Sequence, residues 1–190
     1  MIFQEFAKIC LKVLKFDKSF FKDEKNFGQA SIYFALVIII LGSIISIIPN
    51  SAFLNYMSGS FNLGLIEGPS LKAVIITAII MWFIKSTYLF FVGVVLFPGK
   101  KTKCNYRKIL ILVAFSKIPL LFNFIILSPS LLFLSVITYI WYNISLIIGI
   151  NHILKFDSYF KSTIIVLGPI ILLFLFFVNQ LFNNNSSIIS

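Results

Sequence analysis

The chain has 190 residues, 59% of them hydrophobic, and a mean hydropathy of +1.03. This composition excludes an ordinary soluble domain and indicates a membrane protein. The formal net charge is +10, but the basic residues gather in short segments between apolar runs. Membrane topology and attraction to anionic lipid account for such a charge, so no nucleic acid partner is expected.

Residues 1–29 form a basic head. From Ile2 to Lys22 the polar positions recur at helical spacing, and apolar residues fill the remaining arc. This pattern is typical of a basic amphipathic helix that lies in the membrane interface. An alternative is a helix packed on the protein's own cytoplasmic loops. The head lacks an uninterrupted apolar run and a small-residue cleavage site, so we expect no signal peptide.

Five apolar runs of span length follow the head. About 20 helical residues, rising about 1.5 Å each, cross roughly 30 Å of hydrocarbon, and a helix satisfies its own backbone groups there. The sequence therefore predicts an all-α integral membrane protein, a five-transmembrane-helix bundle with an N-terminal amphipathic interfacial helix. The membrane domain is expected at residues 30–182, before a short outer tail at 183–190. Its spans are predicted at about 30–48, 73–97, 109–127, 131–150 and 163–182.

The basic residues predict the orientation of the chain, because short loops rich in Lys and Arg stay on the cytoplasmic side. Six lysines precede the first span, five basic residues lie in the loop at 98–108, and two lie in the loop at 151–162. The loop at 49–72 has one, and the tail has none. The N-terminus is therefore expected in the cytoplasm and the C-terminus outside.

Two lysines, Lys85 and Lys117, lie inside predicted spans that contain no Asp or Glu. A lysine at the centre of a span costs roughly 2.5 to 3.5 kcal/mol, so each should extend to the interface or face a polar interior. Nearby hydroxyl and amide side chains predict a polar layer in the cytoplasmic half of the bundle. Our hypothesis is that this layer, continuous with the basic loop, holds an anionic lipid headgroup or a small anion. The candidate residues are Lys85, Lys117, Asn143, Lys100, Lys101, Lys103, Arg107 and Lys108.

The simpler alternative is that both lysines only extend to the interface and the hydroxyls bond between helices. Other chemistry has little support in the sequence. The acidic residues lie outside the spans and form no pair for acid and base catalysis. His152 has no neighbouring ligand residues, and Cys10 and Cys104 match no zinc or redox spacing. We therefore expect no catalytic residues, no metal site and no cofactor.

Short motifs along nearly the whole chain resemble the Ypt-interacting-protein (Yip) family of five-span membrane proteins, especially its prokaryotic branch. The resemblance implies an integral membrane protein with a cytoplasmic N-terminus; eukaryotic members shape membranes and bind Rab-type GTPases. The head of this chain is short and basic instead of long and proline-rich or acidic, so no functional residue is carried over. The motifs are Lys18-Ser-Phe-Phe-Lys22, Gly28, Leu96-Phe-Pro-Gly-Lys100, Tyr106-Arg-Lys108, Ala114-Phe-Ser-Lys-Ile-Pro119, Ile140-Trp141 and Leu146-Ile-Ile-Gly-Ile-Asn-His152.

We expect a non-enzymatic multi-pass protein that organises or adapts its membrane through lipid or protein partners. Candidate partners are the bilayer, anionic inner-leaflet lipids, a second copy, or another membrane protein. The second hypothesis is a small anion channel or permease lined by Lys85 and Lys117, which needs a polar route through both leaflets. In the outer half of the second and third spans, Asn123 is the exception to a thinning of polar residues. Abundant Phe, Ile, Lys and Asn favour a bacterial inner membrane; a eukaryotic chain would lie in the ER or Golgi membrane.

Overall fold

A computed structural model describes residues 2–17, 19, 21, 29–47, 70–99, 104–126 and 131–186. Every element within these ranges is a helix, so the all-α class is confirmed. The elements are α1 (Ile2–Leu14), α3 (Gln29–Ile45), α5 (Leu71–Phe90), the π-helix η2 (Phe91–Leu96), α6 (Tyr106–Ser116), the 3₁₀-helix η3 (Ile118–Ile125), α7 (Phe133–Leu154) and α8 (Tyr159–Ser186).

Four helical segments of the described chain are long and apolar enough to cross a membrane. They are Leu71–Leu96, Tyr106–Ile125, Phe133–Leu154 and Tyr159–Gln180, and they match the second to fifth predicted spans with ends shifted by a few residues. The first predicted span corresponds to α3, whose apolar part, Ser31–Ile45, is shorter. A fifth crossing of the membrane therefore stays a prediction.

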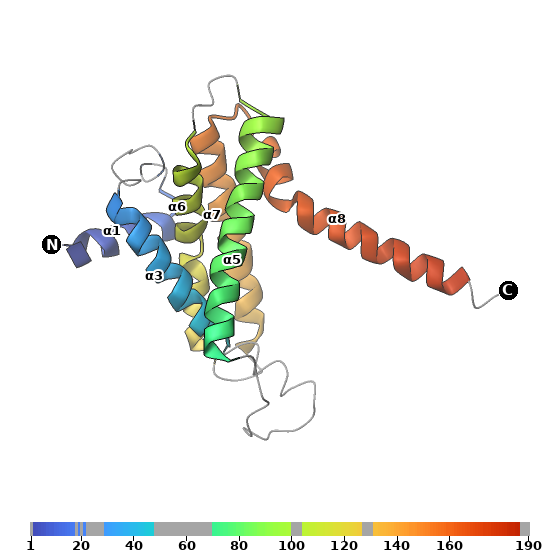
Figure 1. Cartoon of the computed structure of the whole chain (residues 1–190), viewed down its shortest axis with the longest axis horizontal. Helices are drawn as coiled ribbons and strands as arrows, with labels where there is room; N and C mark the ends of the chain where they lie inside the picture. The colour runs from blue at the N-terminus through green and yellow to red at the C-terminus, as the bar shows by residue number, and fades with distance from the viewer. Residues whose placement is uncertain are drawn as a thin grey trace.

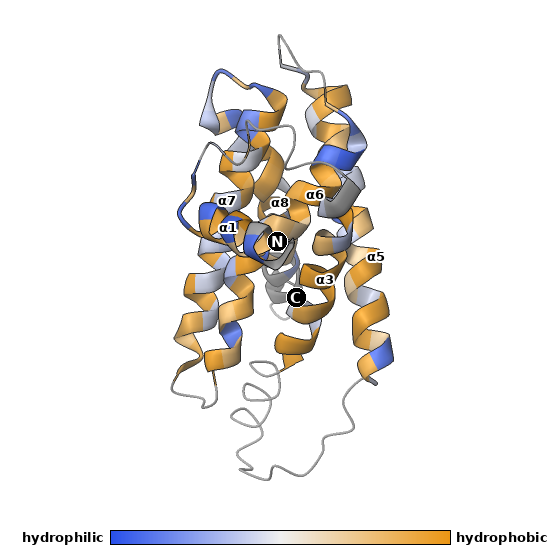
Figure 2. Cartoon of the chain, turned by 90° about the vertical axis from the view of Figure 1, so that its left-hand side faces the viewer, coloured by the Kyte–Doolittle hydropathy of each residue, from blue (hydrophilic) through white to orange (hydrophobic). Residues whose placement is uncertain are grey.

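Helices α3, α5, α6 and α7 lie side by side in a bundle whose ribbon is mostly hydrophobic (Figures 1 and 2). Helix α6 contacts α3, α5 and α7, and every residue from Ile109 to Ser116 is buried. We call the end where α5 and α7 begin the Leu71 end, and the end where η2 and α7 finish the Leu96 end. The predicted orientation assigns the Leu71 end to the outer side of the membrane.

Close contacts between helices hold the bundle together. A Cβ atom added to Gly93 would lie 2.5 Å from the Leu154 side chain, and one added to Gly149 would clash with Leu112. The indole Nε1 of Trp82 on α5 also donates a buried hydrogen bond of 2.8 Å to the carbonyl of Leu110 on α6. Transmembrane helices usually associate through small residues and interhelical hydrogen bonds, because burial of apolar side chains gives little driving force for helix association in lipid.

The third span changes its helix type in the middle. Helix α6 ends at Ser116, Lys117 forms the cap, and η3 continues in the same span with Pro119 in its first turn. Proline has no backbone N–H and its ring clashes with the carbonyl four residues earlier, so an α-helix cannot pass it unchanged.

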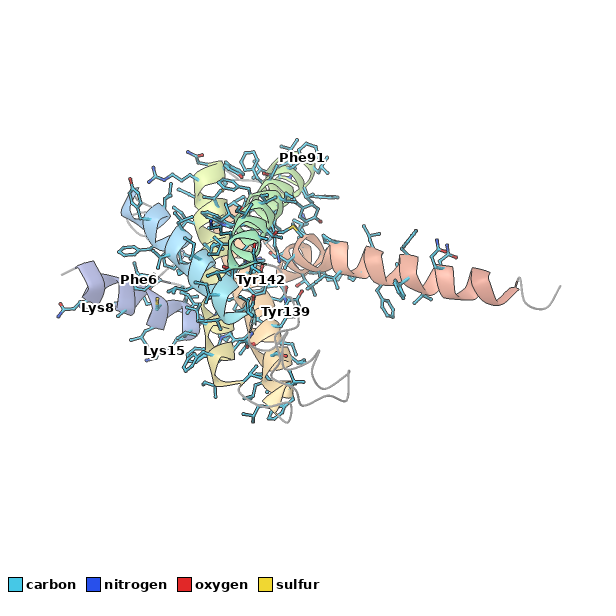
Figure 3. All side chains as sticks on the ribbon, turned by 60° about the horizontal axis from the view of Figure 1, so that its bottom comes forward. Phe6, Lys8, Lys15, Phe91, Tyr139 and Tyr142 are labelled. Atoms are coloured by element: carbon cyan, nitrogen blue, oxygen red, sulfur yellow. The ribbon has the colours of Figure 1, made fainter. Side chains whose placement is uncertain are left out.

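Helix α1 lies against the side of the bundle. It packs on α6 and η3, and the Phe6 ring stacks on Phe34 of α3 with 4.8 Å between centroids. Lys8 and Lys15 are exposed and point away from the bundle (Figure 3). The helix ends where Phe16 adopts a left-handed backbone conformation, with φ 54°. Helix α1 thus packs on the protein's own helices, and its place at a membrane interface stays a prediction.

Helix α8 leaves the bundle after its first turns and extends away from it (Figure 1). Its start packs on α7 and η2, where Ser162, Ile165 and Val166 are buried. Of its described side chains beyond Pro169, all but the half-buried Val178 are exposed, with Phe177 at 70%. An apolar helix with this much exposed surface is suited to contact with lipid.

Candidate functional site

Lys85 lies in α5, beside the face that packs into the bundle. Trp82, Ser86 and Leu89 form that buried face at helical spacing. The Nζ atom of Lys85 is 4.6 Å from the centre of the Tyr142 ring on α7, and Tyr142 is only 3% exposed. Figure 3 shows Tyr142 among the packed helices. This cation–π contact directs the lysine into the bundle rather than toward a membrane surface.

A cavity of about 370 Å³ lies between α3, α5 and the junction of α6 with η3. Lys117, at that junction, forms part of its wall, and the cavity extends to Ser46 and Ala73 near the Leu71 end. Small-molecule sites have about 300 to 1,000 Å³, so this cavity is at the lower limit of that class. Its other lining residues are Ile39, Gly42, Ser43, Val74, Thr77, Ala78, Leu120 and Asn123.

Few hydrogen-bond donors line this cavity. The Oδ1 atom of Asn123 accepts a hydrogen bond of 2.6 Å from the Thr138 hydroxyl, which leaves the amide NH₂ group as a donor. The hydroxyls of Ser43 and Ser46 already donate to the carbonyls of Ile40 and Ser43, at 2.7 Å and 2.8 Å. Each hydroxyl has one hydrogen, so these serines offer only lone pairs. The described donors that remain are the side chains of Lys117, Asn123 and Thr77.

The described helices around the two lysines, α3, α5, α6, η3 and α7, contain no carboxylate to balance the positive charge. Lys117 is close enough to Lys85 to act on it electrostatically, and the two like charges repel. The sequence has no Asp or Glu between Glu67 and Asp157, and α3 has none either. A negatively charged group placed near both lysines would therefore be attracted without competition from α3, α5, α6, η3 or α7.

Buried hydroxyls lie on α6 and α7, one of them on Ser116, the residue before Lys117. Gly149 faces Leu112 across the antiparallel pair α6 and α7, and Ser145 and Ser116 each lie one helical turn from these residues, toward the Leu71 end. These serines are 0% and 1% exposed, and their hydroxyl oxygens form no hydrogen bond. The amide of Asn143 donates to the Tyr139 carbonyl at 2.8 Å, while its Oδ1 has no partner. The predicted polar layer therefore contains buried groups that can still form hydrogen bonds.

The basic residues at the Leu96 end form a separate region. Arg107 and Lys108 lie in the first turn of α6, and Lys100, Lys101 and Lys103 lie outside the described residues. Between this turn and Lys117, the α6 side chains from Ile109 to Phe115 are apolar and buried. On α6 an apolar stretch therefore separates this turn from Lys117, and continuity between the lysine pair and the basic loop stays a prediction.

Sequence reasoning missed the polar residues of the outer half. It identified Asn123 as an exception but did not connect it with Ser43, Ser46 and Thr77 on α3 and α5. The spacing of three between Ser43 and Ser46 puts them on one face of α3, and this was the available signal. No pattern in the sequence could show that this face meets Lys117.

The remaining candidate groups do not assemble into a reactive centre. The His152 ring lies nearly parallel to the Phe21 ring, with 6.3 Å between centroids. Burial raises the pKa of the Cys10 and Cys104 thiols to about 11, which keeps them protonated and poorly nucleophilic at neutral pH. In the parts of the chain that the structure describes, no three His, Cys, Asp or Glu side chains come close enough to hold a metal ion.

The helices and their apolar surfaces define a multi-pass membrane protein with a mostly apolar cavity between its helices, to which Lys117 contributes the one cation among the described residues. A family model, the Yip1 domain, matches residues 12–179. This match covers most of the chain, which therefore belongs to the Yip1 domain family. No curated protein and no solved structure matches it.

Proposed function

We propose that this protein is a non-enzymatic member of the Yip1 domain family that organises or adapts its membrane by holding anionic lipid between its helices. The observation that supports this most is the pair Lys85 and Lys117, two neighbouring cations among helices without a carboxylate. Each intramembrane lysine costs roughly 2.5 to 3.5 kcal/mol. A bound anion offsets part of this cost, which gives the pair a binding role.

The proposal includes a location. The excess of lysine and arginine before the first span and in the loop at 98–108 favours a cytoplasmic N-terminus and an outer C-terminus. A bacterial inner membrane is the proposed site. The basic head and the basic loop then face anionic lipid of the inner leaflet, which attracts each nearby Lys or Arg by about 1 kcal/mol.

Native mass spectrometry of the full-length protein tests the lipid proposal. The protein is released from detergent with phosphatidylglycerol or cardiolipin present, and retained lipid is counted. The double variant Lys85→Met, Lys117→Met removes both intramembrane charges with little change in side-chain length. We expect it to retain much less anionic lipid than the unaltered protein.

Lys72→Met, Lys161→Met is the matched control, because both of these lysines are exposed helix residues. It removes the same net charge outside the site and should retain lipid normally. Equal retention by the two double variants would show that surface charge alone, and not the lysine pair, binds the lipid.

A second candidate is a small anion channel or permease lined by Lys85 and Lys117. The cavity that runs from Ser46 and Ala73 to Lys117 favours it, because it supplies polar groups in one half of the bundle. Toward the Leu96 end, Gly149 packs against Leu112 and Gly93 against Leu154, so that half is tightly filled. Anion flux in protein-containing liposomes that disappears in the Lys85→Met, Lys117→Met variant would favour this candidate over the lipid-holding role.

A further inference from the structure

The cavity beside Lys117 has the donors for only one small negatively charged group. Its described donors are one ammonium, one amide and one threonine hydroxyl, while Ser43 and Ser46 present lone pairs. Lone pairs repel extra anionic oxygens, so a phosphate dianion with three charged oxygens is poorly matched. A group with one charge and two accepting oxygens, such as a carboxylate or a phosphodiester, matches Lys117 and Asn123.

The orientation of the Asn123 amide supports this assignment. The one hydrogen of the Thr138 hydroxyl has two acceptors in reach, Oδ1 of Asn123 at 2.6 Å and the Ser135 carbonyl at 3.0 Å. In the shorter bond Oδ1 is the acceptor, which leaves the NH₂ end of the amide available. Asn123 lines the cavity, so its NH₂ group is the end that can meet a ligand there. An anion therefore finds a donor in this side chain and no competing oxygen.

The rest of the wall is suited to a hydrocarbon chain. Ile39, Val74, Ala78 and Leu120 also line the cavity, which extends to Ser46 and Ala73 near the Leu71 end. At about 370 Å³ the cavity takes a headgroup with a few carbons, so a longer chain must extend out between helices. An anionic amphiphile satisfies both the donors and the apolar wall, whereas a free inorganic ion satisfies only the donors.

We propose that the cavity between α3, α5 and η3 binds the monoanionic oxygen group of an amphiphile, with Lys117 and Asn123 as its donors. This rests on the proposed function and specifies its ligand class and its site. The carboxylate of a fatty acid and the phosphodiester of a phospholipid share the required chemistry. Under the predicted orientation the Ser46 and Ala73 end of the cavity lies toward the outer leaflet.

Binding to the full-length protein in detergent tests the assignment, with palmitate, phosphatidylglycerol and sodium phosphate as separate probes. We expect one or both amphiphiles to bind and inorganic phosphate to bind at least tenfold more weakly. Lys117→Met removes a charge-assisted bond, and Asn123→Asp replaces the donor by an acceptor while keeping an oxygen for Thr138. Each should weaken binding about tenfold to a hundredfold. Palmitate binding identifies a carboxylate ligand, and phosphatidylglycerol binding identifies a phosphodiester.

Ala78→Leu keeps every polar group and fills the cavity, so it tests the site even if a charge variant fails to fold. Lys72→Met is the control for charge, since Lys72 is exposed in the first turn of α5. Loss of amphiphile binding in Ala78→Leu with normal binding in Lys72→Met supports the site. Normal binding in both Ala78→Leu and Asn123→Asp, together with loss of binding in the Lys85→Met, Lys117→Met variant, would contradict binding of the amphiphile in this cavity. The proposed function would still hold in that case. No retention of any anionic amphiphile by the unaltered protein overturns both.

Discussion

The hydroxyl of Thr138 on α7 donates a hydrogen bond of 2.6 Å to Oδ1 of Asn123 on η3, and both side chains are buried. This bond links α7 to η3 in the Leu71 half of the bundle. Helix η3 belongs to the span that changes helix type at Lys117. It also holds Asn123 at the wall of the cavity. Stability and ligand binding are therefore coupled at this pair.

Replacing Thr138 by Val should destabilise the protein by about 1 kcal/mol, because the shape is kept but Oδ1 of Asn123 loses its buried donor. The measurement is unfolding by SDS titration in mixed micelles, followed by circular dichroism. Thr163→Val is the control, since the Thr163 hydroxyl donates within its own helix to the Tyr159 carbonyl. If both variants lose the same free energy of unfolding, the hydrogen bond between η3 and α7 adds nothing to the stability of the protein.

Lys85 and Tyr142 should show coupled stability effects. Tyr142→Phe keeps the aromatic face under the ammonium, whereas Tyr142→Leu removes it. In a double-mutant cycle with Lys85→Met, we expect Tyr142→Leu to give a coupling free energy of about 0.5 to 2 kcal/mol. Tyr142→Phe should give much less, because the contact survives. Additive effects of Lys85→Met and Tyr142→Leu would contradict the cation–π contact.

Alanine should be tolerated at Gly42 and not at Gly149. An added Cβ at Gly149 meets Leu112 and, at 2.9 Å, Phe21, so the variant should lose about 1 to 3 kcal/mol by overpacking. At Gly42 the nearest atom is a Leu121 methyl at 3.8 Å. Gly42→Ala should therefore be neutral or gain up to about 1 kcal/mol of helix stability. Thermal inactivation midpoints in detergent compare the two, and the reverse order would contradict the packing at Gly149.

Cys10 and Cys104 should react slowly with iodoacetamide at neutral pH. Burial raises both thiol pKa values from 9.0 to about 11, so the thiolate fraction is about a hundredfold below that of a free thiol. The labelling rate, read by mass spectrometry on each single-cysteine variant, should rise with pH until about 11 and should increase on denaturation at pH 7.

The same shifts have a defined sign for stability. The folded state favours the neutral thiols, so their contribution is complete below pH 9 and is lost as pH rises through about 11. Equal labelling rates for native and denatured protein at pH 7 would contradict the burial of these side chains.

A fifth membrane crossing can be tested through the two ends of the chain. With five crossings the termini lie on opposite sides, and with four they lie on the same side. We expect a green fluorescent protein fused to the N-terminus to fluoresce and alkaline phosphatase fused to the C-terminus to be active in a bacterial host. Fluorescence from both termini would exclude α3 as a full span, and swapping the two reporters controls for expression.

The helices were predictable because span-length apolar runs must become helices in lipid. Lys85 and Lys117 could also be brought together, since their positions in antiparallel spans imply similar depths. The burial of every side chain from Ile109 to Ser116 was not predicted, because sequence periodicity does not show that a helix is surrounded by protein on all sides. The path of α8 away from the bundle could not be predicted from the sequence either, since an apolar span has the same pattern whether lipid or protein surrounds it.

The cavity could not be predicted for a different reason. Its polar groups come from α3, α5 and η3, which are far apart in the sequence and each contribute only one or two. Single serines and threonines in apolar helices usually bond to their own backbone, as Ser43 and Ser46 do. Only the packing of the three helices distinguishes a shared cavity from isolated hydroxyls.

The 3₁₀ form of η3 aligns residues that an α-helix would spread around its circumference. With three residues per turn, Lys117, Leu120 and Asn123 fall in one straight row, and all three line the cavity. In an α-helix each step of three residues drifts by about 60°, which would turn Asn123 about 120° away from Lys117. The change of helix type at Pro119 therefore places the ammonium of Lys117 and the amide of Asn123 on the same face of the span.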